Sequence, residues 1–333
     1  MSIQYDDNQH KDDLPVIATY LQSLPHGITL SCRSVGDTGR PVLIFLHGFP
    51  EAAFVWEELL VHFAKPENGG YRCVAPNLRG FENSSAPTDV AAYRPKHLVS
   101  DIAALIEVEG GGAPIACLVA HDWGGAVAWN LAASQPQLIK KLAIINSPHP
   151  GTFLRELKTS PQQQAASAYM NFLIRPDAEA LLAEDDFRRL FEFFMPFSSV
   201  KSTSGGDDRI APRTAPAWLT EKVKDQYRQV WQSGLTGSLN FYRASPLRPP
   251  RPGPPHHDPA AAAVVIPPEL LMVLVPTLVL WGMGDIALPP ALLDGLADFV
   301  PNMQLERIDG ATHWIVHEQA DLVMQRLQSF LRA

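Results

Sequence analysis

The chain has few cysteines and no long apolar run. Each of these features excludes a class of protein or a kind of site. Its three cysteines, Cys32, Cys73 and Cys117, are isolated within apolar stretches, so we expect reduced core residues and neither disulfides nor a metal site. No apolar run reaches the ~18 residues of a membrane span, and residues 1–13 are polar and acidic, unlike a signal peptide. These features predict a cytoplasmic protein.

Clusters of basic residues are also missing, and the net charge is −8. We therefore expect neither nucleic acid nor an anionic membrane among the partners. The length of 333 residues exceeds the ~150 residues typical of one domain, and a hydrophobic content of 46% is enough to fill a large core. One core with an inserted second domain is the natural expectation, and the oligomeric state cannot be derived.

Short apolar stretches of strand length alternate with stretches that have helical spacing of apolar residues. We expect strands at residues 26–36, 41–46, 71–76, 114–120, 141–146, 275–281 and 303–308, and helices at 51–64, 95–108, 126–133, 290–300 and 316–331. This alternation predicts an α/β fold with a doubly wound, mostly parallel sheet. Its ligand site would lie beyond the carboxyl ends of the strands.

The alternation is interrupted in the middle of the chain. Residues 151–245 are helical in pattern and rich in aromatic side chains, which predicts a helical cap over the sheet. Residues 246–269 are too rich in proline for a regular element and are expected to form a surface loop. The predicted organisation is an N-terminal extension (1–25), a core (26–150 and 270–333), the cap and the proline-rich loop.

The most informative stretch is the turn between the strand at 114–120 and the helix that follows it. Residues 120–124, AHDWG, have the small-x-nucleophile-x-small spacing of a nucleophile elbow, with Asp122 at the centre. A carboxylate that attacks a saturated carbon leaves an ester that water can later cleave, whereas an alkoxide would leave a stable ether. Asp122 therefore favours substrates such as epoxides or alkyl halides. The alternative is that Asp122 only caps the following helix.

Asp285 and His313 each follow a predicted strand. Together with Asp122 they give the chain order nucleophile, acid, histidine. His313 is the candidate general base, because an imidazole can take a proton from water at neutral pH. Asp285 would orient its ring and stabilise the imidazolium. His317, one helical turn later, is expected to pack or to lie at the surface.

Attack on an ester carbonyl also needs hydrogen-bond donors for the negative charge that develops on its oxygen. The backbone N–H groups of Trp123, just after Asp122, and of Phe49, in the turn His47-Gly48-Phe49-Pro50, are placed by their motifs to form this oxyanion hole. Pro50 lies in a sharp turn and is a candidate cis proline.

Taken together, the motifs resemble those of the epoxide hydrolase family of α/β-hydrolases, which is related to haloalkane and fluoroacetate dehalogenases. The resemblance runs from about Gly27 to the C-terminus. It is carried by HGFPE (47–51), LRGFENSSAP (78–87), AHDWGG (120–125), NSPHP (146–150), LNFYR (239–243), WGMGD (281–285) and GATHW (310–314). The long proline-rich stretch departs from the usual short return from cap to core.

The resemblance implies an α/β-hydrolase fold with a helical cap, an epoxide as substrate, a role in detoxification, and no metal or organic cofactor. It also implies that two cap tyrosines, Tyr169 and Tyr242, bind and protonate the epoxide oxygen. A phenol can do so because it stays protonated at neutral pH. Substrate-binding side chains are expected at His47, Pro50, Trp123, Phe172 and Trp314.

Two other functions remain open at this stage. A dehalogenase would use the same three catalytic residues, but halides need no proton from the cap tyrosines. Fluoroacetate dehalogenases favour arginine where Trp123 stands, and haloalkane dehalogenases favour asparagine or glutamate where Phe49 stands. A non-catalytic binder of small molecules is the alternative from another class, since a fold does not fix a function.

Overall fold

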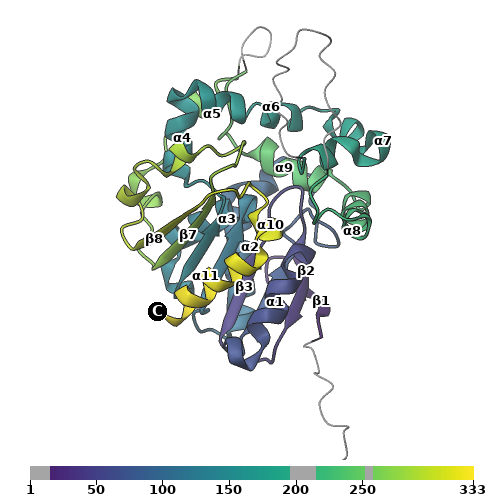
Figure 1. Ribbon diagram of the computed structural model, residues 1–333. Helices are drawn as coiled ribbons and strands as arrows, with labels where there is room; N and C mark the ends of the chain where they lie inside the picture. The colour runs from purple at the N-terminus through teal and green to yellow at the C-terminus, as the bar shows by residue number, and fades with distance from the viewer. Residues whose placement is uncertain (1–15, 196–214, 252–257) are drawn as a thin grey trace, which may run out of the picture.

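The computed structural model describes residues 16–195, 215–251 and 258–333 (Figure 1). Within these ranges eight strands form one sheet in the order β1-β2-β4-β3-β5-β6-β7-β8. Strand β2 pairs antiparallel with both β1 and β4, and the other neighbouring strands are parallel. The strands are β1 (Ala18–Ser23), β2 (Thr29–Val35), β3 (Val42–Leu46), β4 (Arg72–Pro76), β5 (Cys117–His121), β6 (Leu142–Ile145), β7 (Thr277–Gly282) and β8 (Met303–Ile308).

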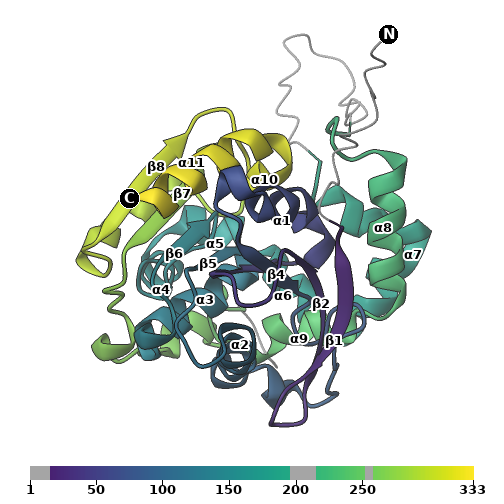
Figure 2. The same cartoon turned by 90° about the horizontal axis from the view of Figure 1, so that it is seen from below.

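Helices cover both faces of this sheet, as the alternation in the sequence predicts (Figure 2). On one face α1 (Glu57–Ala64) contacts α11 (Ala320–Arg332), and on the other α2 (Pro95–Gly110) contacts α3 (Asp122–Ser134). Every residue of β3, β5, β6 and β7 is buried. This two-sided burial explains why these strands are continuous apolar runs and do not alternate with polar residues.

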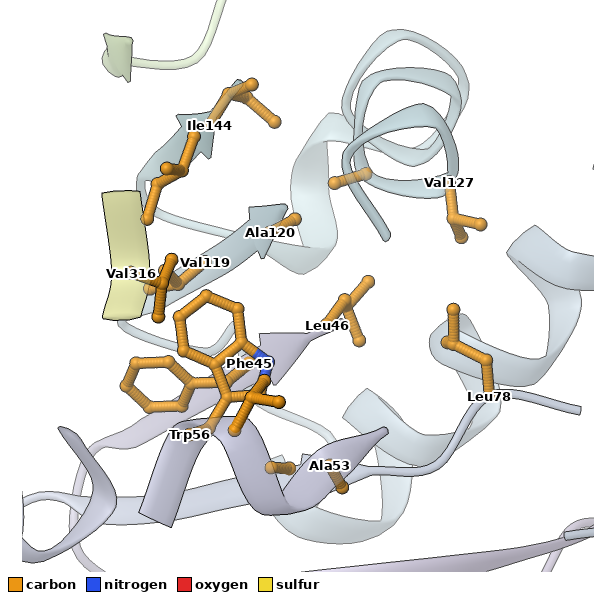
Figure 3. Packing of buried hydrophobic residues seen from close by; sticks show 14 of the residues in the cluster. Phe45, Leu46, Ala53, Trp56, Leu78, Val119, Ala120, Val127, Ile144 and Val316 are labelled. Carbon is orange, nitrogen blue, oxygen red and sulfur yellow. The ribbon is translucent and has the colours of Figure 1, made fainter. Parts of the chain in front are cut away.

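Figure 3 shows how the two faces are filled. Phe45 and Leu46 follow each other in β3 and point to opposite faces, as strand geometry requires. Phe45 packs on Trp56 of the 3-10 turn η1 (Ala53–Trp56), with ring centroids 5.5 Å apart, whereas Leu46 faces Val127 of α3. The three cysteines are buried and free, in agreement with the prediction of reduced core residues.

One strand was not predicted, and three of the predicted helices are shorter or broken in the structure. Strand β1 lies inside the predicted N-terminal extension, and its mostly exposed edge position leaves little apolar alternation to detect. The helix expected at 290–300 is two short 3-10 turns, η7 (Pro290–Leu293) and η8 (Leu296–Asp298), because Gly295 between them has a φ of +67°. The helix expected at 51–64 begins as η1, and the closing helix is broken at Gln319 into α10 (Ile315–Glu318) and α11.

Between β6 and β7 the chain forms helices that lie over one end of the sheet (Figure 1). Apart from Pro150, they fall within the residues expected to form the cap, and they are α4 (Pro150–Thr159), α5 (Pro161–Ala166), α6 (Tyr169–Leu173), α7 (Ala178–Glu192), α8 (Glu221–Gln232) and α9 (Thr236–Ala244). The proline-rich stretch then returns to β7 with two short 3-10 turns, η5 (Ala260–Ala263) and η6 (Pro268–Leu270). In the described ranges, none of the helices is both long and apolar enough to cross a membrane.

A buried ion pair fixes the loop between β4 and α2. Arg79 donates to both carboxylate oxygens of Asp101 in α2, at 2.6 Å each, and its other N–H groups donate to the carbonyls of Ala92 and His97. Both side chains are almost fully buried. The Arg79 hydrogen bonds hold this loop in place. The same loop also packs closely on α9, since Gly80 lies so near Gly237 that neither position has room for a Cβ atom.

Asp101→Ala is expected to lower the free energy of unfolding by about 3–5 kcal/mol, because it leaves the Arg79 guanidinium buried without a counter-charge. Asp225→Ala is the matched control, since it removes an aspartate from α8 that pairs with Arg228 at an exposed site. That loss should stay below about 1 kcal/mol. Urea unfolding followed by circular dichroism measures both, and equal losses would contradict the role given to the Arg79 pair.

Candidate active site

Asp122 occupies a strained turn between β5 and α3. Its φ is +48°, a left-handed conformation that non-glycine residues rarely adopt. The turn also depends on close approach of the backbone, since a Cβ atom at Gly124 would lie 2.5 Å from the carbonyl oxygen of Leu46. The carboxylate does not cap α3; instead its Oδ1 accepts a hydrogen bond of 2.8 Å from the Phe49 backbone N–H. The geometry is that of a nucleophile elbow, and the helix-cap alternative has no support.

The loops after β7 and β8 bring Asp285 and His313 to Asp122. His313 Nδ1 lies 2.6 Å from Asp285 Oδ2, and His313 Nε2 lies 3.6 Å from Asp122 Oδ2. Asp285 is held by the backbone N–H groups of Ala287 and Leu288 and by the side-chain amide of Asn146 at the end of β6. Strand ends that are far apart in sequence therefore converge on one imidazole.

The charges of these three residues stabilise one another. Burial disfavours the imidazolium, but the nearby carboxylates of Asp285 and Asp122 outweigh it and hold the pKa of His313 well above its usual range. Burial likewise disfavours the carboxylate of Asp122, yet the hydrogen bond and charge of His313, with the Phe49 N–H, lower the pKa of Asp122. Before any reaction the pair is a carboxylate beside an imidazolium.

One of the two backbone donors expected at an oxyanion hole contacts this carboxylate. The Phe49 N–H already points at Asp122, and the Phe49–Pro50 peptide bond is cis, as predicted. The Trp123 N–H belongs to the first turn of α3, where backbone N–H groups have no partner within the helix.

Two cap tyrosines line the same cavity as this carboxylate. Tyr169 of α6 and Tyr242 of α9 line a cavity of about 240 Å³ together with Asp122 and Trp123. The two phenol rings lie with their centroids 6.2 Å apart, and the Tyr242 ring packs edge-on against Trp123 and Phe49. Burial, with the nearby Asp122 carboxylate, raises the pKa of both tyrosines above the ordinary value. Both hydroxyls are therefore protonated and able to donate.

The residues expected to bind substrate are not all brought together. Trp123 lines the cavity, whereas His47, Pro50, Phe172 and Trp314 are not among its lining residues. His47 instead supports the turn that carries Phe49: Nδ1 contacts the Gly48 carbonyl at 2.9 Å, and Nε2 accepts from the Leu78 N–H. Burial lowers the pKa of His47 to about 4, so the ring is neutral, as this bonding requires.

Two of the other three residues, Pro50 and Trp314, join cap and core. The Pro50 carbonyl accepts from the indole N–H of Trp231 in α8, and the Trp314 indole donates to the Phe193 carbonyl just after α7. Phe172 in α6 lies under the Arg175 guanidinium. Sequence spacing does not show which way a side chain points, so their directions could not be predicted.

A buried carboxylate beside the site was missed by the sequence analysis. Glu51 is in contact with His121 at 3.1 Å and His317 at 2.6 Å, and it accepts a hydrogen bond of 3.0 Å from the Tyr227 hydroxyl of α8. Burial disfavours its charge, but the two histidines hold the pKa of Glu51 well below its usual range. His121 also contacts the His313 carbonyl at 2.9 Å, so this cluster supports the backbone that carries His313. The only sequence signal was the acidic residue after HGFP.

Comparison with known proteins places this architecture in a family. A family model described as alpha/beta hydrolase fold matches residues 41–320. The AB hydrolase superfamily protein YfhM of Bacillus subtilis (strain 168) is 32% identical over 311 residues, which cover 92% of this chain and 96% of that protein.

Two solved structures of epoxide hydrolases are similar along almost the whole chain. One, from work on novel epoxide hydrolases in metagenomes from hot environments, is 34% identical with a TM-score of 0.76 and covers 95% of this chain and 99% of that one. The other is the Bacillus megaterium epoxide hydrolase in complex with an inhibitor, 28% identical with a TM-score of 0.78, covering 94% and 100%. This chain therefore belongs to the α/β-hydrolase fold family, and its resemblance to the epoxide hydrolases of that family is confirmed.

Proposed function

We propose that this protein is an epoxide hydrolase, which adds water to an epoxide to give a vicinal diol through an ester on Asp122. The observation that carries the proposal is that two protonated cap hydroxyls, Tyr169 and Tyr242, share one cavity with the Asp122 carboxylate. Ring opening creates an alkoxide, and only a substrate that becomes an alkoxide needs such donors.

In the first half of the reaction, Asp122 attacks a ring carbon of the epoxide. A bond forms between a carboxylate oxygen and that carbon while the bond from the carbon to the epoxide oxygen breaks. Tyr169 and Tyr242 bind the epoxide oxygen, and one of them gives it a proton as its negative charge develops. The product is a hydroxyalkyl ester of Asp122.

In the second half, His313 takes a proton from water, and the resulting hydroxide attacks the ester carbonyl. The N–H groups of Phe49 and Trp123 bind the oxyanion until the diol leaves and the carboxylate returns. Ester formation also prepares the base: it removes the negative charge 3.6 Å from His313 Nε2 that helps to hold the imidazole protonated. The imidazolium then gives up its proton, which replaces the proton that the tyrosine gave to the epoxide oxygen. Asp285 then stabilises the imidazolium that forms when water loses its proton.

The cavity favours an uncharged substrate and so argues against a haloacid dehalogenase. Apart from Asp122, its described lining residues carry no charge, so a substrate carboxylate would lose its hydration and meet no cation among the residues that line the cavity. A non-catalytic binder would not need His313 poised between two carboxylates. We also propose that the protein acts in the cytoplasm, as its composition suggests.

Replacing His313 and Asp122 should stop the reaction at different steps. His313→Gln should open the epoxide once and accumulate the ester, because alkylation uses the carboxylate and the tyrosines, whereas Asp122→Ala should form no adduct. Intact-protein mass spectrometry measures the adduct, and peptide mapping should place it on Asp122. His97→Gln, a histidine outside the cavity lining, is the matched control and should turn over normally.

The same mechanism fixes the source of the new oxygen. In a single turnover of the unmodified protein in heavy-oxygen water, the diol should carry light oxygen from Asp122, because water attacks the ester carbonyl and not the substrate carbon. Heavy oxygen in the diol of that first turnover would mean direct attack by water, and Asp122 would not be the nucleophile.

Removing the cap hydroxyls should slow ring opening. Tyr169→Phe or Tyr242→Phe should lower the alkylation rate by about a hundredfold, and the double variant should nearly abolish it, as general-acid catalysis contributes about 10²–10⁴-fold. Stopped-flow tryptophan fluorescence can follow the step. Tyr93→Phe is the matched control, since this buried hydroxyl donates to the Pro87 carbonyl outside the cavity. Near-normal alkylation by the double variant would favour the dehalogenase alternative.

The two steps should respond differently to acid. The pKa of Asp122 lies below its usual range, so the nucleophile stays ionised and alkylation should persist at about pH 5. Water activation needs neutral His313, and this fraction falls as the pH drops below the histidine pKa in the ester state. Rapid-quench mass spectrometry should therefore find more ester at steady state at low pH than at high pH. A constant ester fraction across this range would contradict the base assigned to His313.

A further inference from the structure

The proline-rich return from cap to core does more than connect them. We call residues 245–251 and 258–270, the parts of this stretch that the structure describes, the return segment. Five of its apolar residues line the same cavity as Asp122, namely Pro246, Leu247, Val264, Ile266 and Leu270. The segment was expected to be a surface loop, yet both of its described arms contribute to the cavity wall.

Specific contacts hold the two arms of the return segment in place. Arg248 and Arg251 in the first arm both pair with Asp258 in the second, at 2.5 and 3.2 Å. Backbone hydrogen bonds from Arg251 N–H to the Asp258 carbonyl and from Ala261 N–H to the Arg248 carbonyl join the arms further. Ion pairs and hydrogen bonds therefore join the two arms of the return segment to each other.

The cap and the core also hold the segment. Lys158 of α4 donates to the Val264 carbonyl at 2.7 Å, and Asn171 of α6 donates to the Pro249 carbonyl at 3.3 Å. At its end η6 packs on α3. The prolines within it restrict its backbone further.

The second arm presents alternate side chains to the cavity and to solvent. Its backbone is extended at Val264, with φ −79° and ψ 135°, so successive side chains point to opposite sides. Val264 and Ile266 line the cavity, whereas Val265 between them is 86% exposed. This alternation gives the wall a definite inner face.

The cavity is elongated, with its reactive groups at one end. Asp122, Ala126 and Asn130 of α3 all line it, and an α-helix rises about 1.5 Å per residue, so the cavity extends about 12 Å along α3. Tyr169 and Tyr242 lie at the Asp122 end. An epoxide ring that reacts with these groups must direct its substituent along α3, past the return segment.

The polar side chains that line the rest of the cavity form hydrogen bonds with backbone groups. The Asn130 amide donates to the Ala126 carbonyl, and Ser147 donates to the Asp122 carbonyl. Ser245 accepts from the Leu247 N–H. The surface beyond the reactive end is therefore mainly hydrocarbon, which stabilises apolar groups and disfavours charged ones.

We propose that the return segment forms one wall of a hydrophobic subsite that selects epoxides with a long, uncharged, apolar substituent. This inference rests on the proposed epoxide hydrolase function and adds the substrate class and the residues that select it. Val264 and Ile266 are specificity-determining side chains, because they contact the substituent and not the reacting atoms.

The test compares kcat/KM for propylene oxide, benzyl glycidyl ether and glycidate in the full chain. The benzyl ether should exceed propylene oxide by about tenfold or more, as a few buried methylene groups in an apolar pocket can supply. Glycidate carries a carboxylate in place of the methyl group of propylene oxide and should be the poorest of the three. Val264→Trp should lower the ratio of benzyl ether to propylene oxide by about tenfold, because the indole fills the subsite.

Val265→Trp is the matched control, since it makes the same change one residue away on the exposed side. In this variant, the ratio of kcat/KM for the benzyl ether to kcat/KM for propylene oxide should stay within about twofold of the ratio in the unmodified protein. If Val264→Trp does not fold, Ile266→Ala serves instead, and the loss of contact area should lower the same ratio by about threefold or more.

The outcomes separate this inference from the proposed function. Turnover of propylene oxide without preference for the benzyl ether, equal ratios in the two tryptophan variants, or efficient turnover of glycidate would overturn the hydrophobic subsite and leave the epoxide hydrolase in place. Failure to turn over any of the three epoxides would overturn the proposed function itself.

Discussion

The site depends on one constraint, the close convergence of the ends of β3 and β5. Asp122 adopts a left-handed backbone at the end of β5, and a Cβ atom on Gly48, just after β3, would overlap its side chain at 2.3 Å. Because β3 and β5 are neighbours in a parallel sheet, both turns emerge at the same edge. The Phe49 N–H can then donate to the Asp122 carboxylate only because glycine leaves that space open.

In the proposed mechanism, the charges at this edge let one histidine be an ion-pair partner first and a base later. In the resting state His313 lies between the carboxylates of Asp285 and Asp122, and its pKa is raised by both. Asp285 accepts hydrogen bonds from two backbone N–H groups and from Asn146, which fix its carboxylate beside His313. Asp122 would lose its charge on alkylation. In the proposed mechanism the substrate itself thus switches His313 from a protonated partner to a base at the step where a base is needed.

The sequence predicts those parts of the structure that depend on a pattern of neighbouring residues in the chain. Buried parallel strands are continuous apolar runs, and Asp122, Asp285 and His313 each follow such a strand, so the sheet and the order of the site were predictable. Strand β1 was not, because an exposed edge strand carries little hydrophobic pattern. The directions of His47 and Trp314 and the cluster around Glu51 were not predictable either. They depend on contacts such as that between Glu51 and His317, which are 266 positions apart in the chain.

The cavity receives its floor and its walls from parts of the chain under different physical constraints. Helix α3 forms the floor and is fixed to the sheet through buried contacts with β5 and β6, so a change in its position would move Asp122. The cap and the return segment form the walls, and the return segment is joined to its surroundings largely by backbone carbonyls, which accept hydrogen bonds whatever their own side chains are. Side chains such as Val264 can therefore change with little effect on the backbone that carries them. Chemistry and selectivity are thus encoded in separate segments, and the selective segment can vary without disturbing the reactive one.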